Sequence, residues 1–507
     1  MAVTEASAPT GETGRRGPDW AVLSLLCLGQ VMVVLDVSIV NVALPAIRAD
    51  LGFSDSGLQW VVNAYTLTFA GFLLLGGRAA DLFGRRRMFI TGLVVFTAAS
   101  LVGGLAQDEL TLVIARGAQG LGGAILSPAT LTLLTTTFVE APKRAKAMAA
   151  WSAVSGGGAA IGSLLGGVLT DLINWRWILF VNVPIGIAAI VASLRVLPEG
   201  RAEQTAGPRR LDLLGSLLVT AGLVAVVYGT VNSQSHGWGD PVTYGPLAGG
   251  VLLLAWFVLH EAKVAPAPVV PLRLFASRGI TVANLVMFWL GCAVIAHFFF
   301  LSLYMQNVLA YDALAAGLAF LPGAIAMTAG AYSGPVLLKR VGVRPLLIGG
   351  PLLSGVGLAW LSVIPVRGSY AADLLVPMIL VTLGAGIAMT PLAITATSGI
   401  PRHEAGLASG VINTTRQVGG SLGLAVLATI GATRAQHLLD TGTAQADAVV
   451  SGYRLAFLVG AAFAVIGALT SIAAPGPAPA PPAAPEPAAA PATGTTAVTP
   501  ATAKSAP

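Results

Sequence analysis

The chain has 507 residues, of which 55% are hydrophobic and only 10% are charged, and its formal net charge is +6. A soluble domain carries about 25% charged residues, so the composition excludes a soluble globular protein and predicts a surface that mostly faces lipid. The basic residues cluster in short loops between apolar runs, which argues against nucleic-acid binding. Those runs are about 20 residues long, the length of a helix that crosses a bilayer, and they lack the alternation of a membrane β-barrel.

Fourteen apolar runs are predicted to be transmembrane helices. The predicted spans are residues 20–44, 57–77, 88–106, 110–134, 148–169, 177–197, 213–231, 242–260, 280–302, 313–335, 346–364, 372–397, 408–430 and 453–474. An even number of spans places both termini on one side, and 21 of the 28 Lys and Arg residues then share that side. Because cytoplasmic loops are enriched in Lys and Arg, we predict a multi-pass protein of a bacterial cell membrane with both termini cytoplasmic.

A weak internal repeat indicates two related halves. The stretch around Pro128 resembles the stretch around Pro391, and internal repeats around a site at the membrane midplane are a common plan of secondary transporters. The predicted domains are, in chain order, a cytoplasmic tail, a six-helix bundle, a linker with two extra spans, a second six-helix bundle and a disordered Pro/Ala-rich tail, over residues 1–19, 20–197, 198–279, 280–474 and 475–507.

One carboxylate lies deep in an apolar run, VMVVLDVSIVNVALP. Of the 22 acidic residues, only Asp36 falls well inside a predicted span, where an Asp costs about 2.5–3.5 kcal/mol on insertion scales. Arg116 lies inside the fourth span at a similar predicted depth, given a rise of about 1.5 Å per residue. We predict that the two side chains pair, and that Asp36 takes up a proton outside and releases it inside while Arg116 stabilises the deprotonated form. The alternative is a static pair that only holds the first and fourth spans together.

Two glycine-containing stretches stand out beyond hydropathy. GRAADLFGRRR, residues 77–87, is predicted to be a tight cytoplasmic loop, although a simple basic anchor would also explain its arginines. GAAIGSLLGG, residues 158–167, repeats glycine every four residues on one helix face, which predicts close contact with a neighbouring helix. Spacing alone favours a plain packing seam there at least as much as a role in conformational change.

These stretches, together with RGAQGLGGA in the fourth span and NWRWILFVNVPIG at the sixth, resemble the major facilitator superfamily, and most closely its fourteen-span drug:proton antiporter family. The resemblance covers roughly residues 20–474. It implies an all-α polytopic fold with two six-helix bundles plus two extra central spans. It also implies an exporter that exchanges drugs or amphiphilic metabolites for protons by alternating access, driven by the proton gradient and without a cofactor.

The resemblance assigns roles to individual positions. The residues that match the conformational switch loop are Gly77, Asp81, Gly84, Arg85 and Arg86. Proton coupling falls to Arg116, and the glycines that match the antiporter helix are Gly158, Gly162, Gly166 and Gly167. Two departures weaken the match, because Ser163 stands where the antiporter signature has proline and Ala79 stands where the loop signature has leucine.

Four polar residues are predicted to face a substrate cavity: Gln30, Asn41, His297 and Arg416. Each residue also has a simpler interpretation. Asn41 would satisfy the hydrogen bonding of the backbone at a kink made by Pro45. His297 would be a packed core residue, and Arg416 would bind helix carbonyls instead of an anionic group. Because few acids are embedded, we expect a neutral, monocationic or weakly anionic amphiphile as cargo. We expect a monomer whose only other partners are protons and the lipid bilayer, with no bound metal.

Several rival functions are excluded or left open. The chain contains no Gly-Lys dipeptide, so it lacks the phosphate-binding loop of an ATP-driven pump, and five scattered histidines supply neither a metal site nor a catalytic base. We therefore predict that it is not an enzyme. A proton-coupled importer of a small metabolite and a transport-inactive membrane sensor remain alternatives.

Overall fold

The protein is described from a computed structural model over residues 18–197, 211–398 and 405–474, and this part of the chain is helical throughout, without strands. The N-terminal half of the chain contains α1 (Asp19–Leu51), α2 (Asp55–Leu58), α3 (Trp60–Phe83), α4 (Arg85–Gly104), α5 (Glu109–Thr137), α6 (Ala141–Leu172), α7 (Trp177–Phe180) and α8 (Asn182–Val196). Two further helices follow, α9 (Leu213–His236) and α10 (Pro241–Lys263). The C-terminal half contains the short helix η1 (Leu272–Ala276), α11 (Arg278–Leu303), the π-helical turn η2 (Tyr304–Val308), α12 (Ala313–Ala319), α13 (Leu321–Val341), α14 (Val343–Leu361), the π-helical turn η3 (Tyr370–Leu374), α15 (Leu375–Thr397), α16 (Ala405–Asp440) and α17 (Gln445–Ser471).

The predicted all-α membrane fold is confirmed. Within the described ranges, 13 helical segments are long and apolar enough to cross a membrane. The remaining predicted span, the fifth in chain order at 148–169, lies in the 32-residue helix α6, whose apolar part among the described residues is the shorter stretch Ile161–Leu172. The described helices belong to one compact unit that ends at Ala474, so the predicted division into two bundles stays a prediction, and the predicted tails fall almost wholly outside the described residues.

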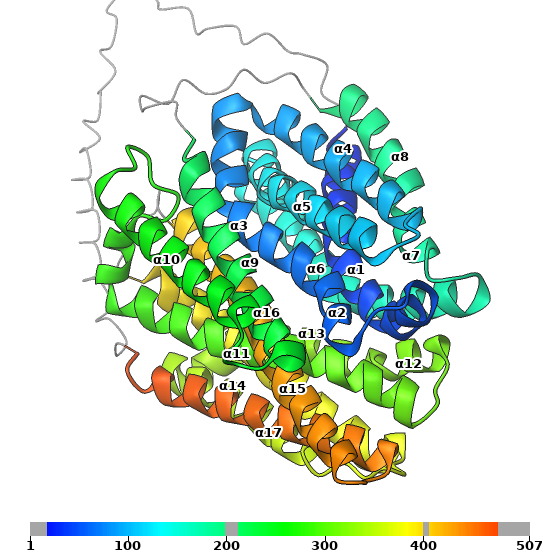
Figure 1. The fold of residues 1–507 in the computed structure, drawn as a ribbon. Coiled ribbons are helices and arrows are strands. Elements are labelled where there is room, and N and C mark those ends of the chain that lie inside the picture. The colour runs from blue at the N-terminus through cyan, green and yellow to red at the C-terminus, as the bar shows by residue number, and fades with distance from the viewer. Residues whose placement is uncertain (1–17, 198–210, 399–404, 475–507) are drawn as a thin grey trace, which may run out of the picture. The chain divides into compact units, whose positions relative to one another are not determined.

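Each half packs mainly on itself, and the two halves meet mainly along two seams, with a smaller contact between α1 and α11. In the N-terminal half α3 and α4 pack on α5, and α1 packs on α6; in the C-terminal half α11 packs on α16, and α13 and α14 pack on α15. The seams between the halves are α3 against α16, and α6 against α12 and α13. Helix α9 packs on α10 and also contacts α3 and α16, so the two extra helices attach at the first seam (Figure 1).

The buried cores differ at the two ends of the helices. We call the end where α1 begins and α17 ends the termini side, and the opposite end the far side. On the far side one continuous core includes residues of both halves, such as Ile39 of α1, Phe300 of α11 and Phe320 before α13. On the termini side α1, α3 and α5 share one core, whereas α11 and α15 share another. The structure is therefore closed between the halves on its far side.

A proline inside α1 contributes to this far-side closure. The predicted span ended at residue 44, but α1 continues through Pro45 to Leu51. Proline has no N–H, so the carbonyl of Asn41 lacks its usual helical donor. Ser302 Oγ of α11 donates to Asn41 O over 2.7 Å and supplies the missing hydrogen bond. The helix tolerates Pro45 because a neighbouring helix satisfies the released carbonyl.

A second side chain strengthens the same contact. Gln306 Nε2 donates to Val42 O over 3.0 Å and to Ser302 Oγ over 2.9 Å. We call the group formed by Asn41, Val42, Ser302 and Gln306 the far-side contact. It joins α1 of the N-terminal half to α11 and η2 of the C-terminal half, and its acceptors on α1 are both backbone carbonyls.

Buried titratable side chains tie the two extra helices together on the termini side. His260 Nε2 of α10 lies 2.8 Å from Asp212 Oδ1, which also accepts from Gly215 N at the start of α9. Glu261 accepts from Val270 N over 2.9 Å, in the segment that leads to α11. The α9–α10 hairpin is therefore attached to the C-terminal half by hydrogen bonds as well as by apolar packing.

Removing one hydrogen bond of the far-side contact should loosen the far side. Ser302→Ala leaves Asn41 O without a donor, at a cost of about 0.5–1.5 kcal/mol to the closed arrangement. We expect the far-side-open fraction to rise by roughly twofold to tenfold. Distances between spin labels at Ala49 and Thr441, placed on a background without Cys27 and Cys292, would measure it.

Ser362→Ala is the control for this experiment. Ser362 lies at the far-side end of α14, and its hydroxyl donates to Ala359 O of its own helix. Its removal should leave the label distances unchanged. An identical distance distribution in Ser302→Ala and the unmodified protein would show that the far-side contact does not hold the halves together.

Candidate functional site

The predicted pair forms the centre of a buried hydrogen-bond network. Arg116 Nη1 lies 2.6 Å from Asp36 Oδ2, and also donates to Gln119 Oε1 over 2.8 Å. Gln119 Nε2 donates to Asp36 Oδ1 over 2.9 Å and to Ser100 Oγ over 2.7 Å. Asn182 Nδ2 approaches Asp36 Oδ1 at 3.4 Å. We call Asp36, Ser100, Arg116, Gln119 and Asn182 the Asp36 network.

The network is sealed from solvent and joins five helices. The Asp36 side chain has no exposed surface and that of Arg116 is 2% exposed. Arg116 Nε also donates to Val61 O of α3 over 3.0 Å, and its guanidinium lies 4.6 Å from the centre of the Tyr65 ring. The predicted pairing is thus confirmed, and it links α1 and α5 to α3, α4 and α8. Its role in proton coupling stays a prediction.

Sequence reasoning found the charged pair but missed the amides around it. Gln119 follows Arg116 by three residues, a spacing that places both on one face of α5. A glutamine buried in a membrane helix needs a hydrogen-bond partner as much as an arginine does. The spacing could therefore have predicted that Gln119 belongs to the same buried site as Arg116. Asn182 lies within NWRWILFVNVPIG, which was interpreted as an aromatic belt, and only the packing of α8 against α1 brings it to Asp36.

The opposite face of α1 rests on glycines. A Cβ on Gly162 of α6 would overlap Ser38 Oγ of α1, and a Cβ on Gly166 would lie 2.7 Å from Ile39 O. Gly158 meets the same helix at Val34. The predicted small-residue face of α6 is therefore a tight packing seam against α1, as close-contact glycines allow.

Gly167 departs from this seam and faces the other half of the chain. Its Cβ would lie 2.5 Å from Ala313 O of α12, while a Cβ on Gly317 would lie 2.5 Å from Ser163 O of α6. The backbone of α6 and the backbone of α12 therefore lie directly against each other at this contact. Helix α6 runs unbroken through Ser163, the position where the family signature has proline.

The predicted switch loop is shorter than expected. Gly77 and Asp81 lie inside α3, and the turn between α3 and α4 consists of Gly84 alone, with φ 98° and ψ 130°. This left-handed conformation requires glycine because other residues clash there. Asp81 Oδ1 lies 3.8 Å from Arg85 Nε across the turn.

A further arginine of this stretch connects to α8. Arg86 Nη2 donates to Leu194 O over 2.9 Å, near the C-terminal end of α8. A cation suits this position because carbonyls at the end of a helix lack intrahelical donors. The stretch therefore joins α3, α4 and α8 on the termini side, beyond serving as a basic anchor.

The four predicted cavity residues do not share one location. Asn41 Nδ2 donates to Val37 O of its own helix, at the far-side contact. His297 is 1% exposed, and its ring packs against Phe298 and Phe457 in the C-terminal half. Gln30 is buried in α1. Their place in a substrate cavity stays a prediction.

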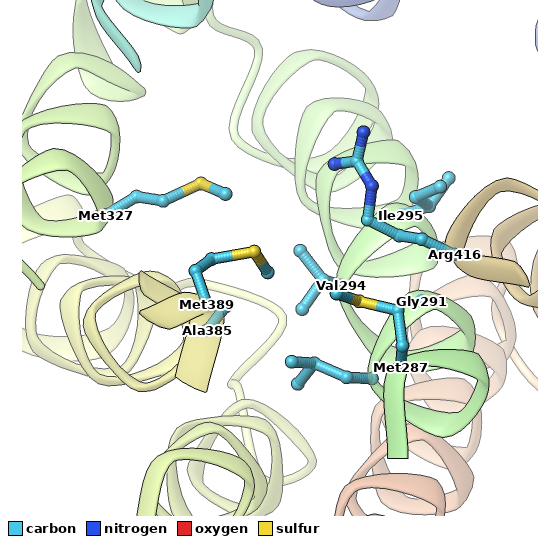
Figure 2. Close-up of a pocket in the computed structure, with 9 residues that line it drawn as sticks. Met287, Gly291, Val294, Ile295, Met327, Ala385, Met389 and Arg416 are labelled. Carbon is cyan, nitrogen blue, oxygen red and sulfur yellow. The ribbon is translucent and has the colours of Figure 1, made fainter. Parts of the chain in front are cut away.

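Arg416 alone of these four lines the described pocket. The pocket lies among α11, α13, α15 and α16, and Figure 2 shows Arg416 on one side with Met327 and Met389 on the other. We call it the methionine pocket. Its lining residues are Met287, Leu290, Gly291, Val294, Ile295, Met327, Ala385, Met389 and Arg416.

Comparisons with known proteins identify the family. The model of the Major Facilitator Superfamily matches residues 26–424. The cephamycin export protein of Amycolatopsis lactamdurans is 45% identical over 85% of this chain and 88% of its own. The puromycin resistance protein of Streptomyces alboniger is 43% identical over 90% of this chain and 92% of its own. The chain belongs to the major facilitator superfamily.

The fold of the superfamily is also found at low sequence identity. An auto-inhibited peptide transporter of the POT family aligns with a TM-score of 0.62 at 17% identity, over 89% of this chain and 96% of its own. The family model and the relatives confirm the resemblance inferred from the motifs. As a member of the major facilitator superfamily, the protein is a multi-pass membrane transporter of small molecules and not an enzyme.

Two adjacent glycines near the switch signature of the superfamily should respond differently to a methyl group. A Cβ on Gly76 would overlap Ala124 O of α5, so we expect Gly76→Ala to destabilise the fold by about 1–3 kcal/mol. A Cβ on Gly77 would lie 3.5 Å from Pro128 Cβ, an ordinary contact. Gly77→Ala should stabilise α3 by about 0.5–1 kcal/mol.

The unfolding midpoints of both variants, measured in detergent by intrinsic tryptophan fluorescence, test this contrast. Equal destabilisation by the two substitutions would contradict it. That result would mean that Gly77 is needed for a reason other than the contacts of this conformation.

Proposed function

We propose that this protein exports antibiotics or related amphiphilic metabolites from a bacterial cell in exchange for protons. The cargo class rests on the relatives, which are named as a cephamycin export protein and a puromycin resistance protein. The proton-coupling site rests on a different observation, the buried Asp36 network. We propose that the protein works as a monomer and without a cofactor.

The Asp36 network supports proton coupling because its charge balance depends on one proton. Deprotonated Asp36 neutralises Arg116, and the two lie 2.6 Å apart in a sealed site. Protonated Asp36 would leave the arginine buried without its counter-charge. Removing one partner of a buried pair costs about 3–5 kcal/mol, so binding of a proton favours a different helix arrangement.

Helix α1 would transmit this change to the far side. Asp36 and the first acceptor of the far-side contact, Asn41, are five residues apart on α1, about 7.5 Å at the rise of an α-helix. The glycine seam on α6 supports the opposite face of α1 along this segment. A shift of α1 relative to α5 would therefore act directly on the hydrogen bonds from Ser302 and Gln306.

The predicted orientation makes the termini side cytoplasmic, so the closed far side would face outward. The described conformation then corresponds to a state that is closed towards the outside. A proton that enters across about 100 mV supplies about 2.3 kcal/mol. This energy supports a gradient of roughly 50-fold for a neutral cargo moved by one proton.

Transport in inside-out vesicles tests the proposal. The host should lack its own efflux pumps, and vesicles should carry an imposed proton gradient with the interior acidic. We expect uptake of a cephamycin by the unmodified protein, accompanied by release of protons from the vesicle interior. Asp36→Asn should abolish both, because the neutral amide has no proton to exchange.

Asp171→Asn serves as the matched control. Asp171 is an exposed acid of α6, outside the Asp36 network, and its loss should leave uptake and proton release intact. Equal transport by Asp36→Asn and the unmodified protein would assign the pair a structural role. Uptake without proton movement in the unmodified protein would exclude antiport.

A further inference from the structure

We propose that the methionine pocket binds the anionic group of an amphiphilic cargo through Arg416, with the apolar body of the cargo held by the three methionines. This inference deepens the proposed export function, since it names the charge class of the cargo. The inference relies on the proposed export function only for the direction in which the cargo moves. Binding of the cargo to the pocket can be measured without transport.

The first argument is the charge balance of the membrane-embedded core. Arg116 is neutralised by Asp36. Arg416 lies eleven residues after the first residue of α16, about 16 Å along the helix, and has no acidic partner in the part of the chain that the structure describes. A charged residue at this depth normally pairs or faces a water-filled cavity that carries substrate.

The second argument is the unfilled hydrogen-bonding capacity of Arg416. A guanidinium has five N–H donors in a fixed planar array. One nitrogen, Nη2, donates to Asn413 Oδ1 over 3.1 Å, and no other acceptor for Arg416 occurs among the described residues. The remaining donors are available at the pocket, and their geometry matches two oxygens of a carboxylate.

The arginine is also held in place by its helix. Gly291 of α11 lies directly against α16, since a Cβ on this glycine would overlap Arg416 O. The backbone of α16 is therefore fixed on α11 at this residue. A cation with a fixed base loses less entropy on binding an anion than a mobile surface arginine would.

The rest of the pocket suits an apolar body. Met287, Met327 and Met389 reach the pocket from three different helices, and Figure 2 shows Met327 and Met389 across from Arg416. Methionine side chains are flexible and make favourable contacts with aromatic rings. An ionic group at one edge with an adaptable apolar wall opposite selects for charge and tolerates varied ring systems.

Three probes with the same apolar body separate charge from hydrophobicity. We would use pyrenebutyrate, its neutral amide and pyrenebutyl-trimethylammonium, with the protein in phosphatidylcholine nanodiscs and empty nanodiscs as blank. We expect the carboxylate to bind at least about tenfold more tightly than the amide, a difference of about 1.4 kcal/mol, and the cation to bind most weakly. Pyrene fluorescence anisotropy measures each Kd.

Variants of the arginine then test its part in this preference. Arg416→Gln should bring the ratio of amide Kd to carboxylate Kd down to about one, while Arg416→Lys keeps part of it because the charge remains. Arg434→Gln is the matched control: Arg434 is an exposed arginine on the same helix that contacts Ser451, and the ratio should be unchanged.

The outcomes are separable from those of the export experiment. Equal binding of carboxylate and amide by the unmodified protein would overturn the inference, as would a proportional loss of all three probes in Arg416→Gln. Loss of carboxylate binding when phosphatidylglycerol is added to the nanodiscs would assign the pocket to an anionic lipid and also overturn it. A charge preference that depends on Arg416, in a protein that moves no cargo against a proton gradient, would uphold the pocket while excluding the proposed export.

Discussion

The arrangement of the N-terminal half depends on one buried ion pair. Asp36 and Arg116 are both removed from water, and neither would be tolerated at this depth without the other. The amides of Gln119 and Asn182 and the carbonyl of Val61 complete the coordination. Five helices thus meet at one buried ion pair and the hydrogen bonds around it.

Helix α1 makes three different kinds of contact along a short stretch of its sequence. One face carries Asp36, the opposite face lies on the glycines of α6, and the segment before Pro45 offers its carbonyls to α11. The glycines of α6 carry no side chain at this seam, so side chains of α1 such as Val34 and Ser38 pack directly on the backbone of α6. Such an interface resists separation, yet it presents few interlocking side chains to oppose sliding along the helix axis.

Hydropathy predicted the number and order of the helices well, because the length of an apolar run and the cost of an exposed backbone leave few options in a bilayer. The Asp36–Arg116 pair was predictable for the same reason, since each charge required a partner at its own depth. Helix ends were less predictable: the first predicted span ended at residue 44, whereas α1 continues through Pro45 to Leu51, and Ser302 on a distant helix satisfies the released carbonyl. Gly77 was expected in a loop, but the only residue in the turn is Gly84.

The distribution of cavity residues was beyond the reach of the sequence. Gln30, Asn41, His297 and Arg416 all looked like polar residues in apolar runs, yet only Arg416 reaches the pocket. Which face of a helix meets a cavity depends on its rotation within the bundle, and that is set by packing between helices that lie far apart in the chain. The methionine pocket draws on four such helices.

The far-side contact has a consequence for how substitutions accumulate. Its donors are the side chains of Ser302 and Gln306, but its acceptors on α1 are the main-chain oxygens of Asn41 and Val42. Every amino acid carries that oxygen, so the hydrogen bonds themselves do not depend on the side chain at either α1 position, although the buried side chain of Val42 is constrained by core packing. The hydrogen bonds of this junction therefore constrain the sequence unequally: on α11 and η2 they require the side chains of Ser302 and Gln306, while on α1 they require only Pro45, the residue that leaves a carbonyl without its helical donor.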